Sequence, residues 1–181
     1  MIKKEITLFS FNELTEDVRA ELIKERAVKL QEDYSNWWLS DDMEMECNYF
    51  LTGEGSCALP KEFNICYSLS YCQGDGVSFQ GRLFKHDAPE IEFANAEYIV
   101  INNIGNYTHS HSFSIEAYDE DGNYIENNGY LYEQFRNISK ELEKIGYGLM
   151  ERDFLDEAEE DLFNQDDVVY LSNGKVWTET V

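Results

Sequence analysis

The sequence predicts an α+β fold, in which an antiparallel sheet of about four to six strands carries helices packed on one face. Two observations lead to it. Near both ends of the chain, apolar residues recur at three- and four-residue steps, as on an amphipathic helix. Between Phe63 and Asp119 they alternate with polar residues instead, as on half-buried strands. Because the 181 residues are 43% hydrophobic and contain no Pro/Gly/Ser-rich linker, we expect one domain over residues 1–181.

The chain begins with one predicted strand and two predicted helices. Lys4–Phe9 alternates enough to form a short strand. An apolar stripe then predicts a helix over about Glu13–Asp33, with Asn12 or Thr15 as its cap. A second helix is predicted over Ser35–Leu51, where apolar residues mark one side and acids mark the other.

The middle of the chain is predicted to form an antiparallel meander. Phe63–Tyr71 and Val77–Leu83 both alternate, and the pattern is typical of a β-hairpin with Asp-Gly as its turn. Glu97–Asn102 and His109–Asp119 are expected to supply a third and a fourth strand. A polar stretch then separates the strands from the next helix.

The last third of the chain is predicted to be helical before a final hairpin. A period of 3.6 residues extends over about Tyr130–Phe163. Gly146 and Gly148 are expected to kink or break this helix, because each glycine costs about 1 kcal/mol in a helix interior. The tail from Val168 has Asn-Gly between two short apolar runs, which predicts a second hairpin.

The segment Gln73-Gly74-Asp75-Gly76 is interpreted as a structural turn rather than an active loop. Glycine adopts positive φ without steric cost, and Asp75 can bond to the backbone of its own turn. A phosphate-binding loop would show GxxxxGK[ST] or GxGxxG leading into a helix, whereas here a strand is predicted to follow. Gln73 and Asp75 are kept as candidate contacts with a partner.

No residues form a recognisable catalytic or metal-binding motif. His109 and His111 stand two apart on a predicted strand and therefore on one face, a spacing that can hold zinc. Two ligands do not make a metal site. A third ligand would have to be His86, a cysteine or an acid, and the sequence does not show which. We expect no catalytic residue, metal or cofactor. We also expect free thiols at all four cysteines, Cys47, Cys57, Cys66 and Cys72.

The chain is strongly acidic. It has 37 acids against 14 lysines and arginines, a formal net charge of −23 and a pI near 4.2. Such a field repels nucleic acid and anionic lipid and attracts basic protein surfaces. The sequence shows no signal peptide and no apolar run near the length of about 20 residues that crosses a bilayer, so we expect a cytoplasmic protein.

The acids are most concentrated in Glu151–Asp167, where nine acids stand against Arg152. Apolar residues between Phe154 and Phe163 provide a narrow stripe on which this segment can dock as a helix with its acids outward. We predict that these carboxylates imitate DNA phosphates and enter a basic groove; a solvated helix face is the alternative. The candidate partner-binding acids are Asp153, Asp156, Glu157, Glu159, Glu160 and Asp161 here, and Asp41, Asp42 and Glu44 in the second helix.

Two segments resemble a group of small bacteriophage and prophage proteins. These are the F-x-E-L helix start at Phe11–Leu14 and the central SLSYxQGDG segment at Ser68–Gly76. The group includes a type II-A anti-CRISPR, which is a Cas9 inhibitor. The resemblance covers about the first half of the chain and brings no catalytic role. It implies a phage-encoded inhibitor in the bacterial host cell, whose acidic surface would bind the positively charged channels of a Cas9-type nuclease.

Two other interpretations stay open. The protein could be a phage regulatory module that binds another host protein, with its acidity incidental. It could also be a metal-binding enzyme that uses His109, His111 and Asp75. Direct DNA binding would need a local basic patch, for which Lys24, Arg26 and Lys29 are the available cluster.

Overall fold

The computed structural model describes residues 6–55, 58–126, 129–165 and 167–178. They form two compact units. Unit 1 contains the described residues up to Asn36 and from Arg152 onward, and unit 2 contains those from Trp37 to Glu151. Each unit has buried apolar residues of its own. The single domain expected over residues 1–181 stays a prediction, because compact units can belong to one domain.

Unit 2 is built on a five-stranded antiparallel sheet. Its strands are β1 (Phe63–Ser68), β2 (Gly76–Phe84), β3 (Tyr98–Asn103), β4 (Phe113–Tyr118) and β5 (Tyr124–Ile125). Each strand pairs with the next along the chain, in the order β1-β2-β3-β4-β5. This meander, together with its helices, confirms the predicted α+β fold and the expected size of the sheet.

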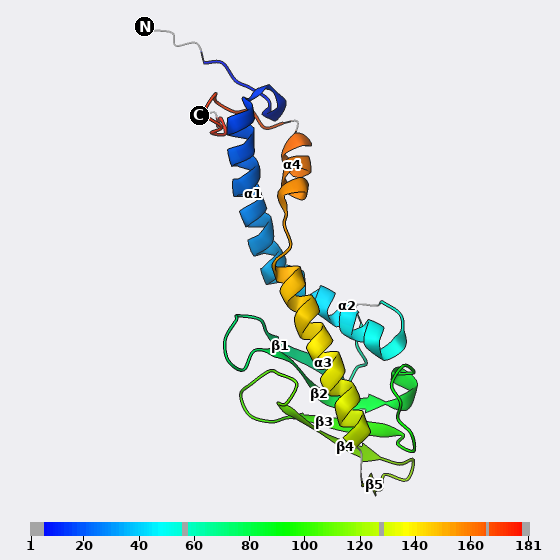
Figure 1. The fold of residues 1–181 in the computed structure, drawn as a ribbon. Helices are drawn as coiled ribbons and strands as arrows, with labels where there is room; N and C mark the ends of the chain where they lie inside the picture. The colour runs from blue at the N-terminus through cyan, green and yellow to red at the C-terminus, as the bar shows by residue number, and fades with distance from the viewer. Residues whose placement is uncertain (1–5, 56–57, 127–128, 166, 179–181) are drawn as a thin grey trace. The chain divides into compact units, whose positions relative to one another are not determined.

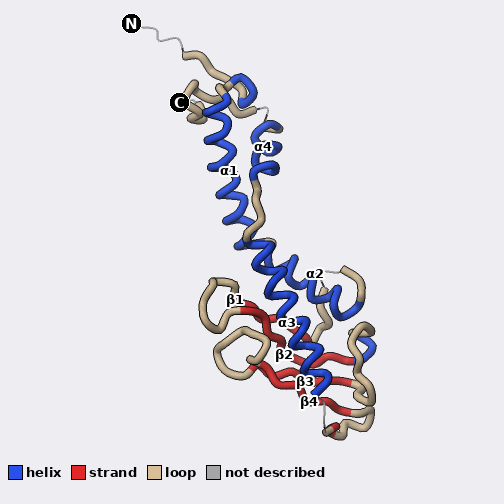
Figure 2. Tube along the Cα trace, in the orientation of Figure 1, coloured by secondary structure: helices blue, strands red, loops and turns tan. Residues whose placement is uncertain are grey.

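Two helices cover one face of this sheet. α3 (Gly129–Met150) crosses the strands, and α2 (Leu39–Thr52) packs against α3 on the same side (Figures 1 and 2). Paired residues of an antiparallel sheet point to the same face, so Leu83 and its partner Ile99 both meet the helices and are fully buried. The largest fully buried side chains of the unit are Met43, Leu51, Phe63, Phe79, Leu83, Phe93, Ile99, Ile101, Phe113, Leu131, Phe135 and Leu142.

Three details of the sheet differ from the prediction. The β1–β2 loop extends over Leu69–Asp75, so the connection is not a tight Asp-Gly turn. β4 begins at Phe113, because the preceding residues form a turn in which the Ser112 N–H donates to the His109 carbonyl at 2.8 Å. β5 was not predicted, since it is a two-residue strand within the polar stretch that follows β4.

α3 continues through Gly146 and Gly148, where the sequence predicted a kink or break. Packing explains the first glycine, because a Cβ on Gly146 would lie 2.7 Å from Leu69 Cδ1 and 3.1 Å from Met43 Sδ. The helix surface must be bare at this point for the two side chains to fit against it. The helical region is interrupted only after Met150, and α4 (Leu155–Phe163) is a separate helix.

The first helical region differs from the prediction at both ends. A 3-10 turn, η1 (Phe11–Glu13), comes first, and α1 (Glu16–Trp37) follows it. The Thr15 carbonyl accepts the Arg19 N–H at 3.0 Å, so Thr15, one of the two expected residues, takes the cap position. The Glu13 carboxylate accepts the backbone N–H of the residue before η1 at 2.9 Å, which closes that turn separately. α1 therefore begins three residues and ends four residues later than expected, and α2 also begins later than expected.

A small apolar core joins the two ends of the chain in unit 1. Phe9 and Tyr170 exchange backbone hydrogen bonds of 2.9 and 2.8 Å, which form an isolated bridge where a strand was expected over Lys4–Phe9. Lys4 itself lies outside the described residues. Tyr170 also bridges Val176, so the predicted tail hairpin is present as a turn with one bridge rather than as two strands. The buried residues of this core are Phe11, Leu14, Leu162 and Tyr170.

Candidate partner-binding surfaces

α4 presents its two sides to different surroundings. Ala158 and Leu162 are buried, and Leu162 belongs to the apolar core of unit 1. At about 100° per residue, the positions opposite them form one outward side of the helix. Phe163 is 57% exposed on that side. We call this side the α4 outer face, and it consists of Asp156, Glu159, Glu160 and Phe163.

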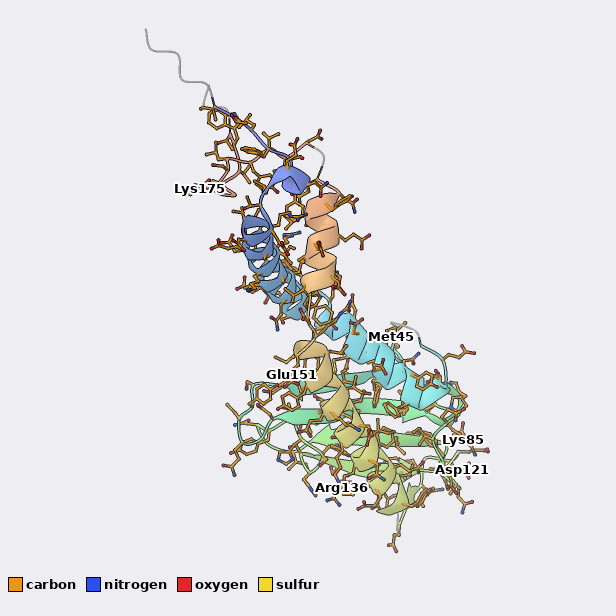
Figure 3. All side chains as sticks on the ribbon, turned by 45° about the horizontal axis from the view of Figure 1, so that its top comes forward. Met45, Lys85, Asp121, Arg136, Glu151 and Lys175 are labelled. Carbon is orange, nitrogen blue, oxygen red and sulfur yellow. The ribbon has the colours of Figure 1, made fainter. Side chains whose placement is uncertain are left out.

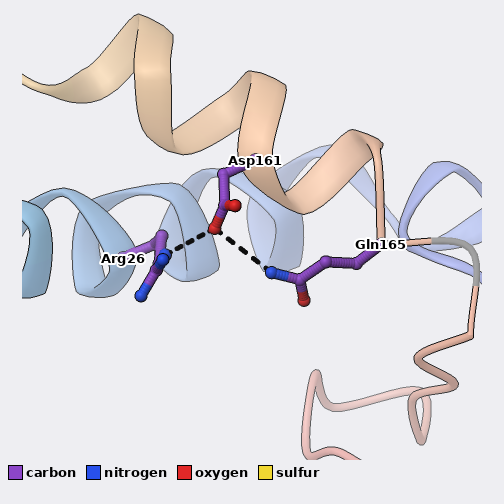
Figure 4. Close-up of polar contacts among 3 residues, drawn as sticks. All are labelled: Arg26, Asp161 and Gln165. Carbon is purple, nitrogen blue, oxygen red and sulfur yellow. Dashed lines mark hydrogen bonds and ion pairs between the residues drawn. The ribbon is translucent and has the colours of Figure 1, made fainter.

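The inner acid of α4 is neutralised by α1. Asp161 accepts hydrogen bonds from Arg26 Nε at 2.6 Å and from Gln165 Nε2 at 3.1 Å (Figure 4). The Arg26 and Asp161 side chains are 32% and 38% exposed, so this pair fixes where α4 lies on α1 more than it adds stability. Asp161, which the sequence proposed for a partner, is thus occupied within unit 1. Arg26 is occupied too, which weakens the basic cluster considered for DNA binding.

Two further predicted acids support the start of α4. Asp153 accepts the Leu155 N–H at 2.9 Å, as a capping residue does. Glu157 forms an ion pair with Arg152. Hydrogen bonds from its own backbone N–H and from Arg152 lower the pKa of the Glu157 carboxyl. Both acids therefore have a role in the fold of unit 1.

The other three predicted acids of this segment remain on the α4 outer face. Within the described ranges of the chain, no ion pair or side-chain hydrogen bond involves Asp156, Glu159 or Glu160. Together with Phe163 and Asn164 they line a shallow hollow. The face thus offers three carboxylates beside an aromatic ring. This arrangement suits a partner that presents lysine or arginine next to an apolar residue.

The predicted acids of α2 belong to unit 2. Asp41 is exposed, whereas Asp42 and Glu44 are half-buried. Asp41 and Asp42 lie in the first turn of α2, where carboxylates interact favourably with the helix dipole. The acids of α2 and of α4 thus belong to different units and form two separate groups.

Asp75 binds four groups of its own loop. Its carboxylate accepts the Cys72 N–H at 2.6 Å, the Ser68 hydroxyl at 2.7 Å, and the N–H and hydroxyl of Ser70 at 2.8 and 3.0 Å. These bonds favour the charged form, and those from Cys72 and Ser68 contribute most as they lower the pKa of Asp75 to about 2. Asp75 therefore braces the β1–β2 loop, and its oxygens are engaged there.

Other residues of the SLSYxQGDG segment also support this loop. Leu69 is buried and packs against Gly146 of α3. Gly74 has φ +99° and lies against the Tyr107 ring, where an added Cβ would come within 2.3 Å of a ring carbon. Gln73, by contrast, is exposed. The structural interpretation of the segment is thus supported by geometry, and Gln73 stays a candidate contact.

The predicted placement of the two histidines on one strand face is wrong. His109 and His111 lie in the turn before β4, where the His111 N–H donates to His109 Nδ1 at 3.1 Å. The Arg136 guanidinium lies 2.9 Å from His111 Nε2, and its charge disfavours a metal ion there. Among the residues that the structure describes, no group of three or more His, Cys, Asp or Glu could hold a metal. The metal-enzyme interpretation therefore loses the geometry on which it depended.

The described cysteines are free thiols, as expected. Cys47, Cys66 and Cys72 form no disulfide, and Cys57 lies outside the described residues. Burial in unit 2 raises the pKa of the Cys47 thiol, and the nearby Glu44 carboxylate raises it further. Cys47 is therefore a protonated core residue rather than a nucleophile.

Sequence reasoning missed the exposed apolar residues of both surfaces. Leu155 and Phe163 were assigned to the stripe that docks α4, but both are exposed. A helical wheel centred on Ala158 and Leu162 places Phe163 on the opposite side, so its exposure could have been predicted. The same wheel places Leu155 on the docking side, so the period does not reveal the exposure of Leu155. Tyr71, at the tip of the β1–β2 loop, is 66% exposed, and a loop has no periodicity from which this could be read.

Comparison of the chain with protein-family models, with curated proteins and with solved structures yielded no match. None of the helices in the described part of the chain is long and apolar enough to span a bilayer.

Proposed function

We propose that the protein is a non-enzymatic inhibitor that binds a basic, nucleic-acid-binding groove of a partner protein through the α4 outer face. One observation carries this proposal. Asp156, Glu159 and Glu160 have no partner among the described residues, whereas Asp153, Glu157 and Asp161 are held by contacts within unit 1. A basic groove would supply the missing cations. The net charge of −23 adds long-range attraction to such a groove.

The spacing of these carboxylates supports a resemblance to a phosphate backbone. Side chains three or four residues apart on a helix stand about 5–6 Å from each other, as Asp156 does from Glu159 and from Glu160. That separation is of the same order as the spacing of successive phosphates on one nucleic-acid strand. The three like charges repel one another, and a cationic partner would relieve this repulsion on binding.

Phe163 adds an apolar anchor to the same hollow. An aromatic side chain that is 57% exposed beside acids is typical of residues that become buried at protein interfaces. The acids would steer the encounter and set the register, and the ring would contribute the burial of apolar area.

A Cas9-type nuclease is the target that we propose. The SLSYxQGDG resemblance implies it, and the positively charged channels of such a nuclease meet the chemical requirement of the α4 outer face. Inhibition in the bacterial cytoplasm would follow if α4 occupied a surface that guide RNA or target DNA needs.

Regulation of another host protein is the second candidate function. The exposed Phe163 favours it, because a mimic of phosphates alone needs no apolar side chain on its contact face. The same face would then bind, but the partner would not be a nuclease.

A DNA-cleavage assay tests the proposal. Cas9 loaded with guide RNA is mixed with excess wild-type protein or with the double variant Glu159→Gln/Glu160→Gln. The control is Glu32→Gln/Asp33→Asn, which removes the same charge from exposed residues of α1 in the same unit. We expect the wild type and the control to inhibit cleavage with similar potency. The α4 variant should need about a tenfold higher concentration, or more, for the same inhibition.

Two results would contradict the proposal. Unimpaired cleavage at excess wild-type protein would exclude Cas9 as the target and leave the second candidate. Equal weakening by both double variants would show that total charge acts, rather than the α4 outer face. Inhibition should also weaken steeply with added salt if the contact is ionic.

A further inference from the structure

The tip of the β1–β2 loop carries an exposed aromatic side chain. Asp75, Leu69 and Gly74 brace the loop from within. Tyr71 at the tip is 66% exposed and has φ +57°. Aromatic residues rarely take this left-handed conformation, because it brings Cβ close to the backbone. The braced loop therefore holds an exposed ring in a conformation that the residue itself disfavours.

The Tyr71 ring is fixed against α3. It stacks on Tyr147 with ring centroids 4.6 Å apart and planes at 28°. Its hydroxyl donates to the Glu151 carboxylate at 2.5 Å. Glu151 lies directly after the end of α3 (Figure 3). Tyr147 covers one side of the ring, and the exposure of Tyr71 leaves the other side open. We call Tyr71, Tyr147 and Glu151 the Tyr71 platform.

The surroundings of this platform are negative. The sequence of unit 2 contains 20 acids and six lysines and arginines. Burial raises the pKa of the Tyr147 phenol, and the nearby charges of Asp75 and Glu143 raise it further. The hydrogen bond to Glu151 raises the pKa of Tyr71, so both rings stay neutral at physiological pH. Neutral, electron-rich ring faces beside carboxylates attract cations.

Arginine is the side chain that fits this arrangement best. Its planar guanidinium stacks on an aromatic face and can at the same time donate to a carboxylate at the edge of the ring. The compact ammonium of lysine cannot do both with the same geometry. A nucleic-acid base could also stack on the ring, but its phosphates would meet the excess of acids in unit 2.

We propose that the Tyr71 platform is an interaction surface that receives an arginine side chain of a partner protein. Tyr71 would supply the stacking face and Glu151 the carboxylate. This inference goes beyond the proposed function, because it assigns a contact to unit 2 that does not use the α4 outer face.

Amide NMR on the full-length, nitrogen-15-labelled protein tests the inference. The probe is a capped Gly-Arg-Gly peptide at physiological salt, and the same peptide with citrulline serves as the uncharged isostere. We expect shifts of the amides around Tyr71 and at the end of α3, with the arginine peptide bound about threefold or more tightly than the citrulline peptide.

Matched variants assign the shifts to the platform. Tyr71→Ala should abolish them, and Tyr71→Phe, which keeps the ring but loses the bond to Glu151, should retain part of the binding. Tyr49→Ala removes a 56% exposed ring from α2 of the same unit and should leave the shifts unchanged. The amide spectrum of each variant shows directly that it is folded.

Several results would overturn the inference. Shifts spread over the acids of unit 2 and unchanged in Tyr71→Ala would indicate general charge attraction. Equal binding of the citrulline peptide would remove the cation from the argument. A short oligothymidylate that shifts the same amides more strongly would assign the platform to nucleic acid. Glu159→Gln/Glu160→Gln should not alter these shifts, so a failure here is distinct from a failure of nuclease inhibition.

Discussion

Replacing Gly146 by alanine should destabilise unit 2, although alanine is the better helix former. At an open helix position this replacement stabilises by up to about 1 kcal/mol. At Gly146, however, the new Cβ would lie 2.7 Å from Leu69 Cδ1 and 3.1 Å from Met43 Sδ. Leu69 is 6% exposed and Met43 is 0% exposed, so neither side chain can move into solvent to make room.

The expected magnitude is the balance of two effects. Forcing an extra carbon into a packed core costs about 1–3 kcal/mol. The gain in helix propensity offsets up to about 1 kcal/mol of this cost, so we expect a net loss of about 1–2 kcal/mol. Gly148→Ala is the matched control, because it lies in the same helix, is exposed, and has no atom within 4 Å of the added Cβ. It should stabilise by up to about 1 kcal/mol.

Urea unfolding followed by circular dichroism measures both changes. A double-mutant cycle with Leu69→Val then tests the contact itself. Shortening Leu69 costs about 1 kcal/mol in the wild type, because it leaves a cavity. It should cost less in the Gly146→Ala background, where the shorter side chain makes room for the new carbon.

Equal stability of Gly146→Ala and Gly148→Ala would refute this reasoning. It would mean that the Leu69 side chain does not lie close enough to Gly146 to oppose an added Cβ. Strictly additive costs in the cycle would lead to the same conclusion.

Three further predictions concern single interactions. Ser139→Ala should lower the free energy of unfolding by about 1–2 kcal/mol, because the buried Ser139 hydroxyl donates to the Val77 carbonyl at 2.5 Å. Unchanged stability in urea unfolding would contradict this prediction. Because folding lowers the pKa of Asp75 from 3.8 to about 2, its stabilising contribution should be complete above about pH 4 and lost as the pH falls toward 2. Asp75→Asn should flatten that part of a stability–pH curve, and an unaltered curve would argue against the brace. The Arg26 and Asp161 side chains are 32% and 38% exposed, so their ion pair should contribute little to stability. A double-mutant cycle with Arg26→Met and Asp161→Asn should give a coupling energy of about 0–1 kcal/mol, and this energy should decrease at high salt.

The sheet could be predicted from sequence where a strand has one face on the helices. The third strand was expected over Glu97–Asn102 and is observed over Tyr98–Asn103, because burial of alternate residues leaves a clear period of two. The same period led to a wrong strand start at His109, where polar and apolar residues continue to alternate although the chain forms a turn. β5 (Tyr124–Ile125) could not be predicted from it, because two residues are too few to show a period.

The failures at α3 and α4 have a common physical cause, which is contact between residues distant in sequence. Gly146 looks like a helix breaker until Leu69, in a loop of the sheet, is seen to fill the space beside it. The acids of α4 could be placed on a helix from sequence, but Arg26 neutralises Asp161 across 135 positions of the chain. A local sequence pattern cannot predict which carboxylate will pair with a cation so distant in the chain.

The β1–β2 loop separates the residues that hold it in place from those that it exposes. Its serines, its leucine, its aspartate and Gly74 all serve to hold the hairpin. These residues form a rigid mount, while the positions at its apex, Tyr71 to Gln73, are exposed. Changes of the side chains at Cys72 and Gln73 should therefore leave the loop folded, and the apex is a suitable place to graft a new specificity.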